Sequence, residues 1–394
     1  MRRAVIVDTL RTPFGKGREG GALSAMHPVD LLALTLESLV ARTGIDPGMV
    51  DDVIAGCGIP VAEQSGNIAR HALLAAGYPE SVPGISIDRK CGSSQQAVHF
   101  AAQGIMAGAY DVVVACGVEM MSVVPMKANR MGKDDKGSKF RVRYPDGLVS
   151  QGISAELIAA KWGLSREELD AYAVRSHRLA AAAGEDGRLA REVVPVEVPG
   201  AGVVERDEGI RPDSSPEKLA TLRAVFQDEA MARRFPQIQW VVTAGNASQI
   251  TDGASAVLVM AEDRAEALGL TPRAHVTDFA VTGDDPIFML TGVIPATARV
   301  LERAGLTVDD IDVFEVNEAF ASVVLAWQAE TKADPERVNP RGGAIAFGHP
   351  VGASGGRLMA SAVSALEETG GRRALVVMCE SGGMANATLL ERPA

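Results

Sequence analysis

The chain has 394 residues, of which 47% are apolar and 23% are charged, a composition that is ordinary for a globular protein. This length predicts two to three domains and a large buried core. The net charge of −11 argues against nucleic acid or an anionic membrane as the main partner, because phosphate-rich surfaces bind basic proteins.

The first residues predict no targeting segment. Met1, Arg2 and Arg3 begin like a signal peptide, but the apolar run of residues 4–7 stops at Asp8. A signal peptide needs roughly 7–15 apolar residues, and a membrane-spanning helix needs about 20. We therefore expect a cytoplasmic protein.

The cysteines fit a reducing compartment. Their spacing contains no CxxC pair and no zinc-binding pattern, so we expect neither a disulfide framework nor a metal site. The four positions are Cys57, Cys91, Cys116 and Cys379.

Helices and short strands alternate in the first part of the chain. Residues 31–40 predict an amphipathic helix that stops near Gly44, since glycine commonly follows the last turn of a helix. A short strand follows at residues 51–56. The next helix is expected at residues 91–107, and the next strand at residues 111–117.

The same order returns later in the chain. A helix at residues 296–304 stops at Gly305 and precedes a strand at residues 309–316. A glycine-rich turn then opens a helix at residues 352–368, and a strand follows at residues 373–379. Because these strands are short and largely apolar, we expect helices on both of their faces and a duplicated α/β fold. The alternative is an ordinary doubly wound α/β protein without a repeat.

A different region, residues 120–243, separates the two copies. Its first part, residues 127–143, holds seven Lys or Arg and two Asp, and residues 155–183 read as helical. The basic part is either a solvated surface loop or a site that attracts an anionic ligand.

Cys91 is the first candidate for chemistry, because it stands where a strand gives way to a helix. Helix N-terminal amides and the helix dipole stabilise a thiolate at such a position. The adjacent Gly92 lets a substrate approach the backbone. The alternative is a buried structural cysteine.

His349 is the second candidate. It lies between Gly348 and Pro350 in the glycine-rich stretch of residues 339–355, which predicts a stiff loop folded tightly around something. A histidine held in this way is suited to act as a general base, although a single histidine is more often structural.

Two further candidates follow strands of the second copy. Cys379 comes at the end of a strand and before a glycine turn, where α/β folds place groups that face a ligand. Cys116 is its counterpart in the first copy, so one of the two is expected to be catalytic and the other to pack. Asn317 also follows a strand, and its side chain is suited to stabilise an oxyanion.

Taken together, these stretches resemble the thiolase family from Arg11 to Asn386. The resemblance rests on Cys91-Gly92-Ser93, on Asn317-Glu318-Ala319-Phe320, on the glycine-rich stretch around His349, and on Cys379 with its following glycines. It implies a duplicated five-layer fold. The implied parts are an N-terminal half (1–119 plus 244–270), a loop domain (120–243) and a C-terminal half (271–394).

The resemblance also implies a role for each candidate. Cys91 becomes acylated, His349 takes its proton, and Cys379 moves a proton at the α-carbon of acetyl-CoA. Asn317 positions a water in one oxyanion hole, and the backbone amides of Cys91 and Ser381 form another.

Coenzyme A enters as a substrate and not as a retained cofactor, and no metal is implied. Ser248 is expected to contact the pantetheine arm of CoA, and Arg211 its nucleotide end. The basic segment 127–143 is a further place where CoA could be attracted. Family members are dimers or tetramers.

Some positions depart from the family pattern. Gln151 is polar where an apolar residue often lines the acyl pocket, and Ser150 stands where biosynthetic members tend to have His. Glu380 and Ser381 replace a glycine-rich start of the last turn, and Ser381 would be strained if its φ had to be positive. The Gln95-Gln96 pair is similar to some degradative thiolases.

We therefore favour degradative cleavage of a 3-ketoacyl-CoA, with a biosynthetic acetoacetyl-CoA thiolase as the alternative. More distant alternatives are a ketoacyl synthase and a non-enzymatic acyl-CoA-binding or lipid-binding protein. The presence of Cys379 argues against the synthase, because synthases use a pair of histidines. The complete set of Cys91, His349 and Cys379 argues against a protein without catalysis.

Overall fold

The computed structural model describes residues 2–393 of the chain. Its first part contains β1 (Ala4–Arg11), β2 (Gly15–Lys16), α1 (Pro28–Thr43), β3 (Asp52–Gly56), α2 (Ile68–Ala75), β4 (Gly84–Ile87), α3 (Ser93–Met106) and β5 (Val112–Met120). The middle part contains α4 (Gly137–Arg143), α5 (Gln151–Trp162), α6 (Arg166–Glu185), β6 (Val196–Val198), β7 (Gly202–Val204), α7 (Pro216–Ala220) and α8 (Glu229–Arg234). The last part contains β8 (Thr251–Ala261), α9 (Glu262–Ala267), β9 (Ala274–Gly283), α10 (Val293–Ala304), β10 (Val313–Val316), α11 (Ala321–Thr331), α12 (Ala344–Phe347), α13 (Ser354–Thr369), β11 (Arg373–Glu380) and β12 (Met384–Glu391).

One large mixed sheet links the two copies, in the strand order β4-β3-β5-β8-β1-β9-β12-β11-β10. In the first copy, β5 is parallel to β3 and antiparallel to β8, and β8 is antiparallel to β1. In the second copy, β11 is parallel to β10 and antiparallel to β12, and β12 is antiparallel to β9. The shared topology confirms the predicted duplication.

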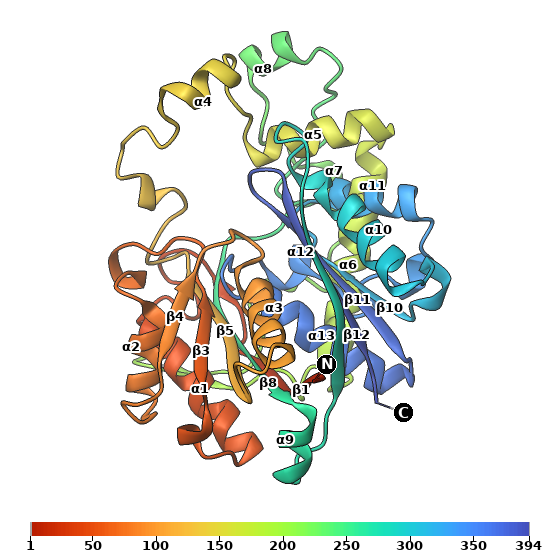
Figure 1. The fold of residues 1–394 in the computed structure, drawn as a ribbon. Coiled ribbons are helices and arrows are strands. Elements are labelled where there is room, and N and C mark those ends of the chain that lie inside the picture. Colours follow the sequence, from red (N-terminus) through yellow and green to blue (C-terminus); the bar gives the residue numbers. More distant parts are fainter. Residues whose placement is uncertain (1, 394) are drawn as a thin grey trace.

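The helices cover both faces of each half of the sheet, as Figure 1 shows. α3 and α13 contact each other and lie between the two halves, where α3 packs on β3 and β5 and α13 packs on β10 and β11. α1 covers the outer face of the first half, and α10 covers that of the second. The result is the expected order of five layers: helix, sheet, helix, sheet, helix. All residues of β5 and β8 are buried, as expected for strands covered on both faces.

The ends of the predicted helices are set by glycine. α1 ends at Gly44 and α10 at Gly305, and both glycines take the left-handed conformation, with φ of 68° and 65°.

The predicted strand at residues 309–316 was wrong in its first half. There Thr307 and Asp310 form a capping box around a short 3₁₀ turn, so the strand β10 starts only at Val313.

The middle region differs from the single helical stretch predicted at residues 155–183. Residues 151–185 form two helices and not one, because Gly163 ends α5 with a left-handed φ of 65°. Ser165 then caps α6 together with Glu168.

Within residues 2–393, no helix is long and apolar enough to cross a membrane.

The basic segment 127–143 includes α4 and lies apart from the sheet (Figure 1). Its side chains are mostly exposed. Asp134 pairs with Arg141 at 2.8 Å, and Asp135 pairs with Arg130 at 3.0 Å. The exposure agrees with a surface segment, and the attraction of an anionic ligand stays a prediction.

Candidate active site

Cys91 lies in the turn between β4 and α3 and has only 4% of its surface exposed. The preceding residue, Lys90, takes a left-handed φ of 51°, a conformation that costs free energy for any residue with a side chain. The Asp88 carboxylate stabilises this turn by accepting the Lys90 backbone N–H at 2.8 Å. The turn places Cys91 at the positive end of the α3 dipole, as the sequence predicted.

The thiol of Cys91 is close enough to that of Cys379 to be influenced by its charge, although the two come from different halves of the chain. Burial is the main cause that raises the pKa of Cys91, and the charge of Cys379 raises this pKa further. The Ser381 backbone N–H opposes the shift because it donates to the Cys91 sulfur. A buried thiol with a raised pKa stays protonated at neutral pH, so Cys91 needs a base to become a nucleophile.

Cys379 is fully buried at the end of β11, and two groups donate to its sulfur. Burial raises the pKa of Cys379 to about 12, while the Asn317 side chain and the Ala319 backbone N–H lower it. The Asn317 Nδ2 atom lies 4.0 Å from the Cys379 sulfur. Within the described chain, the Oδ1 atom of Asn317 is buried and has no hydrogen-bond partner, so it is free to bind a water or a substrate.

His349 is held with one ring nitrogen bound and the other free. The Ser354 hydroxyl donates to the Pro350 carbonyl at 2.8 Å, so its oxygen accepts a hydrogen bond from His349 Nδ1 at 2.5 Å. This pattern places the ring proton on Nδ1 and leaves the lone pair of Nε2 without a partner among the described residues. Burial, together with the charge of Arg357, lowers the pKa of His349 to about 3, so the ring is neutral at physiological pH.

The starts of α3 and α13 meet in the central layer and bring the two halves of the site together. The Gly356 backbone N–H donates to the Ser94 hydroxyl at 3.0 Å. A Cβ atom added at Gly355 would lie 2.3 Å from the Gln95 backbone nitrogen, so only glycine allows this approach. Cys91 and His349 each precede one of these helices and therefore lie at the same edge of the layer.

Sequence reasoning missed two buried carboxylates that hold the catalytic loops. Glu119 lies near the end of β5 and accepts backbone N–H groups from Gly58 at 2.7 Å and from Gly352 at 2.9 Å. It therefore ties the loop of His349 to the first half of the chain. A carboxylate at the end of an apolar strand is the signal that could have revealed it.

The second missed carboxylate, Glu318, follows Asn317 directly. It accepts hydrogen bonds from the Tyr172 hydroxyl at 2.9 Å and the Ser176 hydroxyl at 2.7 Å, both on α6. It also accepts the Ile345 backbone N–H at 3.1 Å. Glu318 thus joins the middle region, the Asn317 turn and the glycine-rich loop.

The two residues expected to bind CoA lie near one another at the edge of this site. Ser248 is half-buried, and its backbone N–H donates to the Ala319 carbonyl at 2.9 Å, beside the Asn317 turn. Arg211 is exposed, and its guanidinium reaches the side chain of Gln249 at 3.4 Å. Since the Gln249 carbonyl accepts the His349 backbone N–H, Gln249 connects this edge to the base.

The positions that depart from the family pattern are unstrained. Gly382 and Gly383 take the positive φ values of the last turn, 94° and 81°. Ser381 has no positive φ, so the backbone strain that a positive φ would cause there does not arise. Gln151 is half-buried at the start of α5. Ser150 is the N-cap of that helix.

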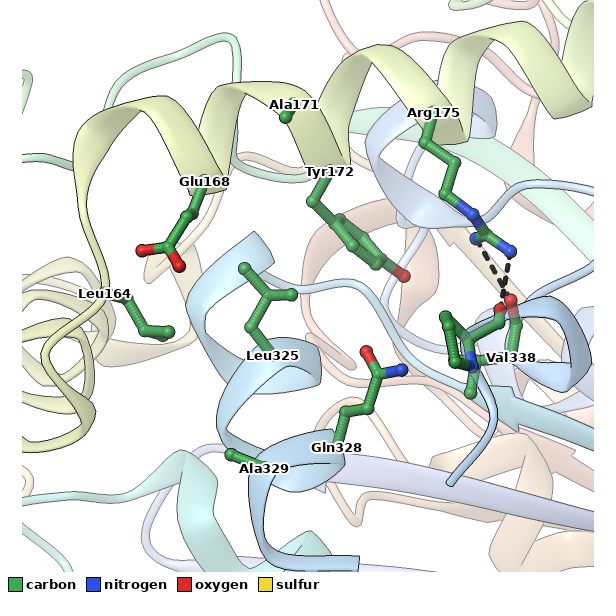
Figure 2. Close-up of a pocket in the computed structure, with 10 residues that line it drawn as sticks. Leu164, Glu168, Ala171, Tyr172, Arg175, Leu325, Gln328, Ala329 and Val338 are labelled. Atoms are coloured by element: carbon green, nitrogen blue, oxygen red, sulfur yellow. Dashed lines mark hydrogen bonds between the residues drawn. The ribbon is translucent and has the colours of Figure 1, made fainter. Parts of the chain in front are cut away.

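A groove of about 510 Å³ between α6 and α11 is a separate feature (Figure 2). Tyr172 and Leu325 line it, and Arg175 donates to the carbonyls of Pro335 and Val338 at one end. None of the predicted site residues lines this groove, so we place the chemistry at the paired thiols.

The duplicated five-layer fold, with a cysteine at the start of one of its two central helices, agrees with the fold expected of the thiolase class of acyltransferases. This chain belongs to the thiolase family. The family model described as the thiolase N-terminal domain matches residues 4–263, and that of the thiolase C-terminal domain matches residues 270–392. The protein is therefore an acyltransferase.

Curated relatives match the chain over its full length. A steroid 3-ketoacyl-CoA thiolase, FadA6 from Mycobacterium tuberculosis, is 48% identical over 100% of this chain and 95% of its own length. A 3-ketoacyl-CoA thiolase from Bacillus subtilis is 41% identical over 99% of this chain and 100% of its own. A 3-oxoadipyl-CoA/3-oxo-5,6-dehydrosuberyl-CoA thiolase from Escherichia coli is 42% identical over the whole of both chains.

Proposed function

We propose that this protein cleaves a 3-ketoacyl-CoA with CoA, giving acetyl-CoA and an acyl-CoA shortened by two carbons. The observation that carries the proposal is that two buried thiols, Cys91 and Cys379, influence each other, while the start of α13, which follows His349, meets the start of α3, which follows Cys91. The Nε2 atom of His349 has no partner among the described residues. Two reactive thiols are needed because one must hold the acyl group while the other moves a proton.

In the first half-reaction, His349 Nε2 takes the proton of Cys91, and the sulfur attacks the keto carbon of the substrate. The carbon–carbon bond then breaks, and the carbanion of acetyl-CoA takes a proton from Cys379. The proton held by His349 then returns to the Cys379 thiolate, which restores both groups. In the second half-reaction, His349 Nε2 takes the proton of the CoA thiol, the CoA sulfur attacks the acyl-Cys91 thioester, and the departing Cys91 sulfur takes that proton. Two oxyanion holes stabilise the charge that develops on the carbonyl oxygens, one with Asn317 and a water and one with the amides of Cys91 and Ser381.

The CoA contacts belong to the same proposal. Ser248 lies beside the Asn317 turn and is suited to contact the pantetheine arm. Arg211 is exposed and positively charged, which suits the phosphates at the nucleotide end of CoA.

We also propose the division into an N-terminal half (1–119 plus 244–270), a loop domain (120–243) and a C-terminal half (271–394). Assembly as a homodimer or homotetramer and a cytoplasmic location complete the proposal. The presence of α4 to α8 in the intervening region supports a separate loop domain.

The degradative direction is supported by the relatives, which are named for 3-ketoacyl-CoA, steroid 3-ketoacyl-CoA and 3-oxoadipyl-CoA substrates. Because these names differ in the acyl group, the assay should compare acyl groups of several sizes. The purified protein would be mixed with CoA and either acetoacetyl-CoA, a longer linear 3-ketoacyl-CoA or a ring-bearing one. We expect acetyl-CoA from at least one of them, and no product from any would overturn the proposal.

A further inference from the structure

Glu380 is a buried carboxyl group without a partner, and it stands between Cys379 and Ser381. Its exposed fraction is 0%, and within residues 2–393 neither carboxylate oxygen accepts a hydrogen bond. Burying an unpaired charged group is costly, so such a residue requires an explanation. No step of the proposed reaction uses it.

The carboxyl group of Glu380 packs against Gly92, the residue just before α3. A Cβ atom added at Gly92 would lie only 1.9 Å from Glu380 Oε1, so glycine is needed for the carboxyl group to fit. Gly92 is the N-cap of α3, a helix of 14 residues. The carboxyl group therefore faces the positive end of the same dipole that is available to Cys91.

The charges around Glu380 do not neutralise it. Burial is the largest cause that raises its pKa, to about 8, while Arg89 lowers this pKa and Asp88 raises it. Arg89 forms no ion pair with Glu380 in the described structure, and its buried Nε atom has no partner either. In turn, the charge of Glu380 raises the pKa of both Cys91 and Cys379.

We propose that Glu380 and Cys91 share the positive end of α3, so that only one of them is anionic at a time. Glu380 thereby limits thiolate formation at Cys91 in alkaline solution and leaves it unhindered near neutral pH. It acts through Cys91 and contacts no reacting atom in this scheme, so it is a positioning residue. The consequence for turnover rests on the proposed function, whereas the coupling itself concerns only the two side chains.

Alkylation of Cys91 by iodoacetamide tests the coupling without turnover. The rate would be measured from pH 6 to pH 9.5 by peptide mass mapping of the segment that contains Cys91. Four proteins would be compared: the unmodified chain, Glu380→Gln, Glu380→Leu and Glu302→Gln. Glu302 is an exposed residue of α10 and serves as the matched control for loss of a carboxylate.

We expect equal rates within about twofold at pH 6.5, where the carboxyl group is protonated. At pH 9, both neutral variants at position 380 should be alkylated about tenfold faster than the unmodified chain, since one pKa unit is a factor of ten in thiolate. Glu302→Gln should follow the unmodified chain.

Two results would overturn the inference. One is that the rate of Cys91 alkylation is the same in all four proteins at every pH. The other is a difference between the Gln and Leu variants as large as the shift itself, which would indicate a change of packing and not of charge. A protein that shows the shift but cleaves no 3-ketoacyl-CoA would refute the proposed function alone.

Discussion

The two copies of the repeat place a cysteine on equivalent strands but not at the same point. In the register of the sheet, Cys116 corresponds to Val377 and Cys379 to Val118, so the predicted correspondence of the two cysteines is wrong. Cys116 lies in β5 and Cys379 in β11, and both are fully buried. Burial alone raises the pKa of Cys116, whereas Asn317 and the Ala319 amide lower that of Cys379. The fold therefore provides equivalent strands, while the position along the strand and the neighbouring donors distinguish the two thiols.

The helix starts of the central layer differ in a corresponding way. The turn before α3 carries the thiol of Cys91, and the loop before α13 carries the imidazole of His349. Because the starts of these two helices meet, duplication supplies two adjacent positions that can hold different chemical groups. The following substitutions test this division between the copies.

The largest effect is expected for Cys91→Ser. A serine hydroxyl is a far weaker nucleophile under the same base, and losing the nucleophile of a catalytic unit costs on the order of 10⁴-fold or more. Both thiolysis of acetoacetyl-CoA and exchange of acetyl groups between acetyl-CoA and labelled CoA should be lost. Retention of exchange by this variant would place the nucleophile elsewhere.

Cys379→Ser should separate the two reactions. Thiolysis requires a proton at the α-carbon of acetyl-CoA, and losing a general acid or base typically costs about 10²–10⁴-fold. Exchange requires only Cys91, His349 and an oxyanion hole, so it should persist. Equal losses of exchange and thiolysis in a folded variant would contradict the separate roles of the two thiols.

Ser354→Ala tests how His349 is held. Without the Ser354 oxygen, His349 Nδ1 loses its acceptor and the ring can take the wrong tautomer. We expect a loss of kcat on the order of tenfold, smaller than the ~10⁴-fold cost of replacing the orienting carboxylate in a serine-protease triad. The control is Ser361→Ala on the same helix, whose buried hydroxyl has no partner in the part of the chain described. If both variants had the same activity, Ser354 would not orient the base.

The smallest effect on activity is expected for Cys116→Ser, the same change of residue in the equivalent strand β5. Its rates of thiolysis and exchange should stay within about twofold, because Cys116 has no donor and lies in the apolar cluster beneath α1. A buried hydroxyl without a partner should instead destabilise the fold by about 1–3 kcal/mol, measured by urea unfolding. A large loss of thiolysis at unchanged stability would show that both copies contribute to the site.

Much of this arrangement could be predicted from the sequence. Glycines 44 and 305 marked the ends of α1 and α10, and the apolar runs marked the buried strands, because backbone conformation and burial leave local patterns. The breaks at Gly163 and at Thr307–Asp310 were missed, since helical or apolar residues flank them. The positions of these two breaks are set by helix capping and turn geometry.

The sequence suggests the candidate residues of the site but not the residues that hold them in place. Cys91, His349 and Cys379 stand next to glycine turns, which a sequence shows. The Ser354 contact with His349 and the Glu119 contact with Gly352 depend on how loops fold and on residues far apart in the chain. Such contacts have no local pattern, and neither does the packing of Glu380 on Gly92.

The most direct test of the central claim is to find which thiol carries the acyl group. The protein would be incubated briefly with acetoacetyl-CoA in the absence of free CoA, digested at acidic pH and mapped by peptide mass. We expect an acetyl group on Cys91 alone, since Cys91 meets the Ser381 amide at the start of α3 and Cys379 moves only protons. An acetyl group found mainly on Cys379 would contradict the assignment of the two thiols.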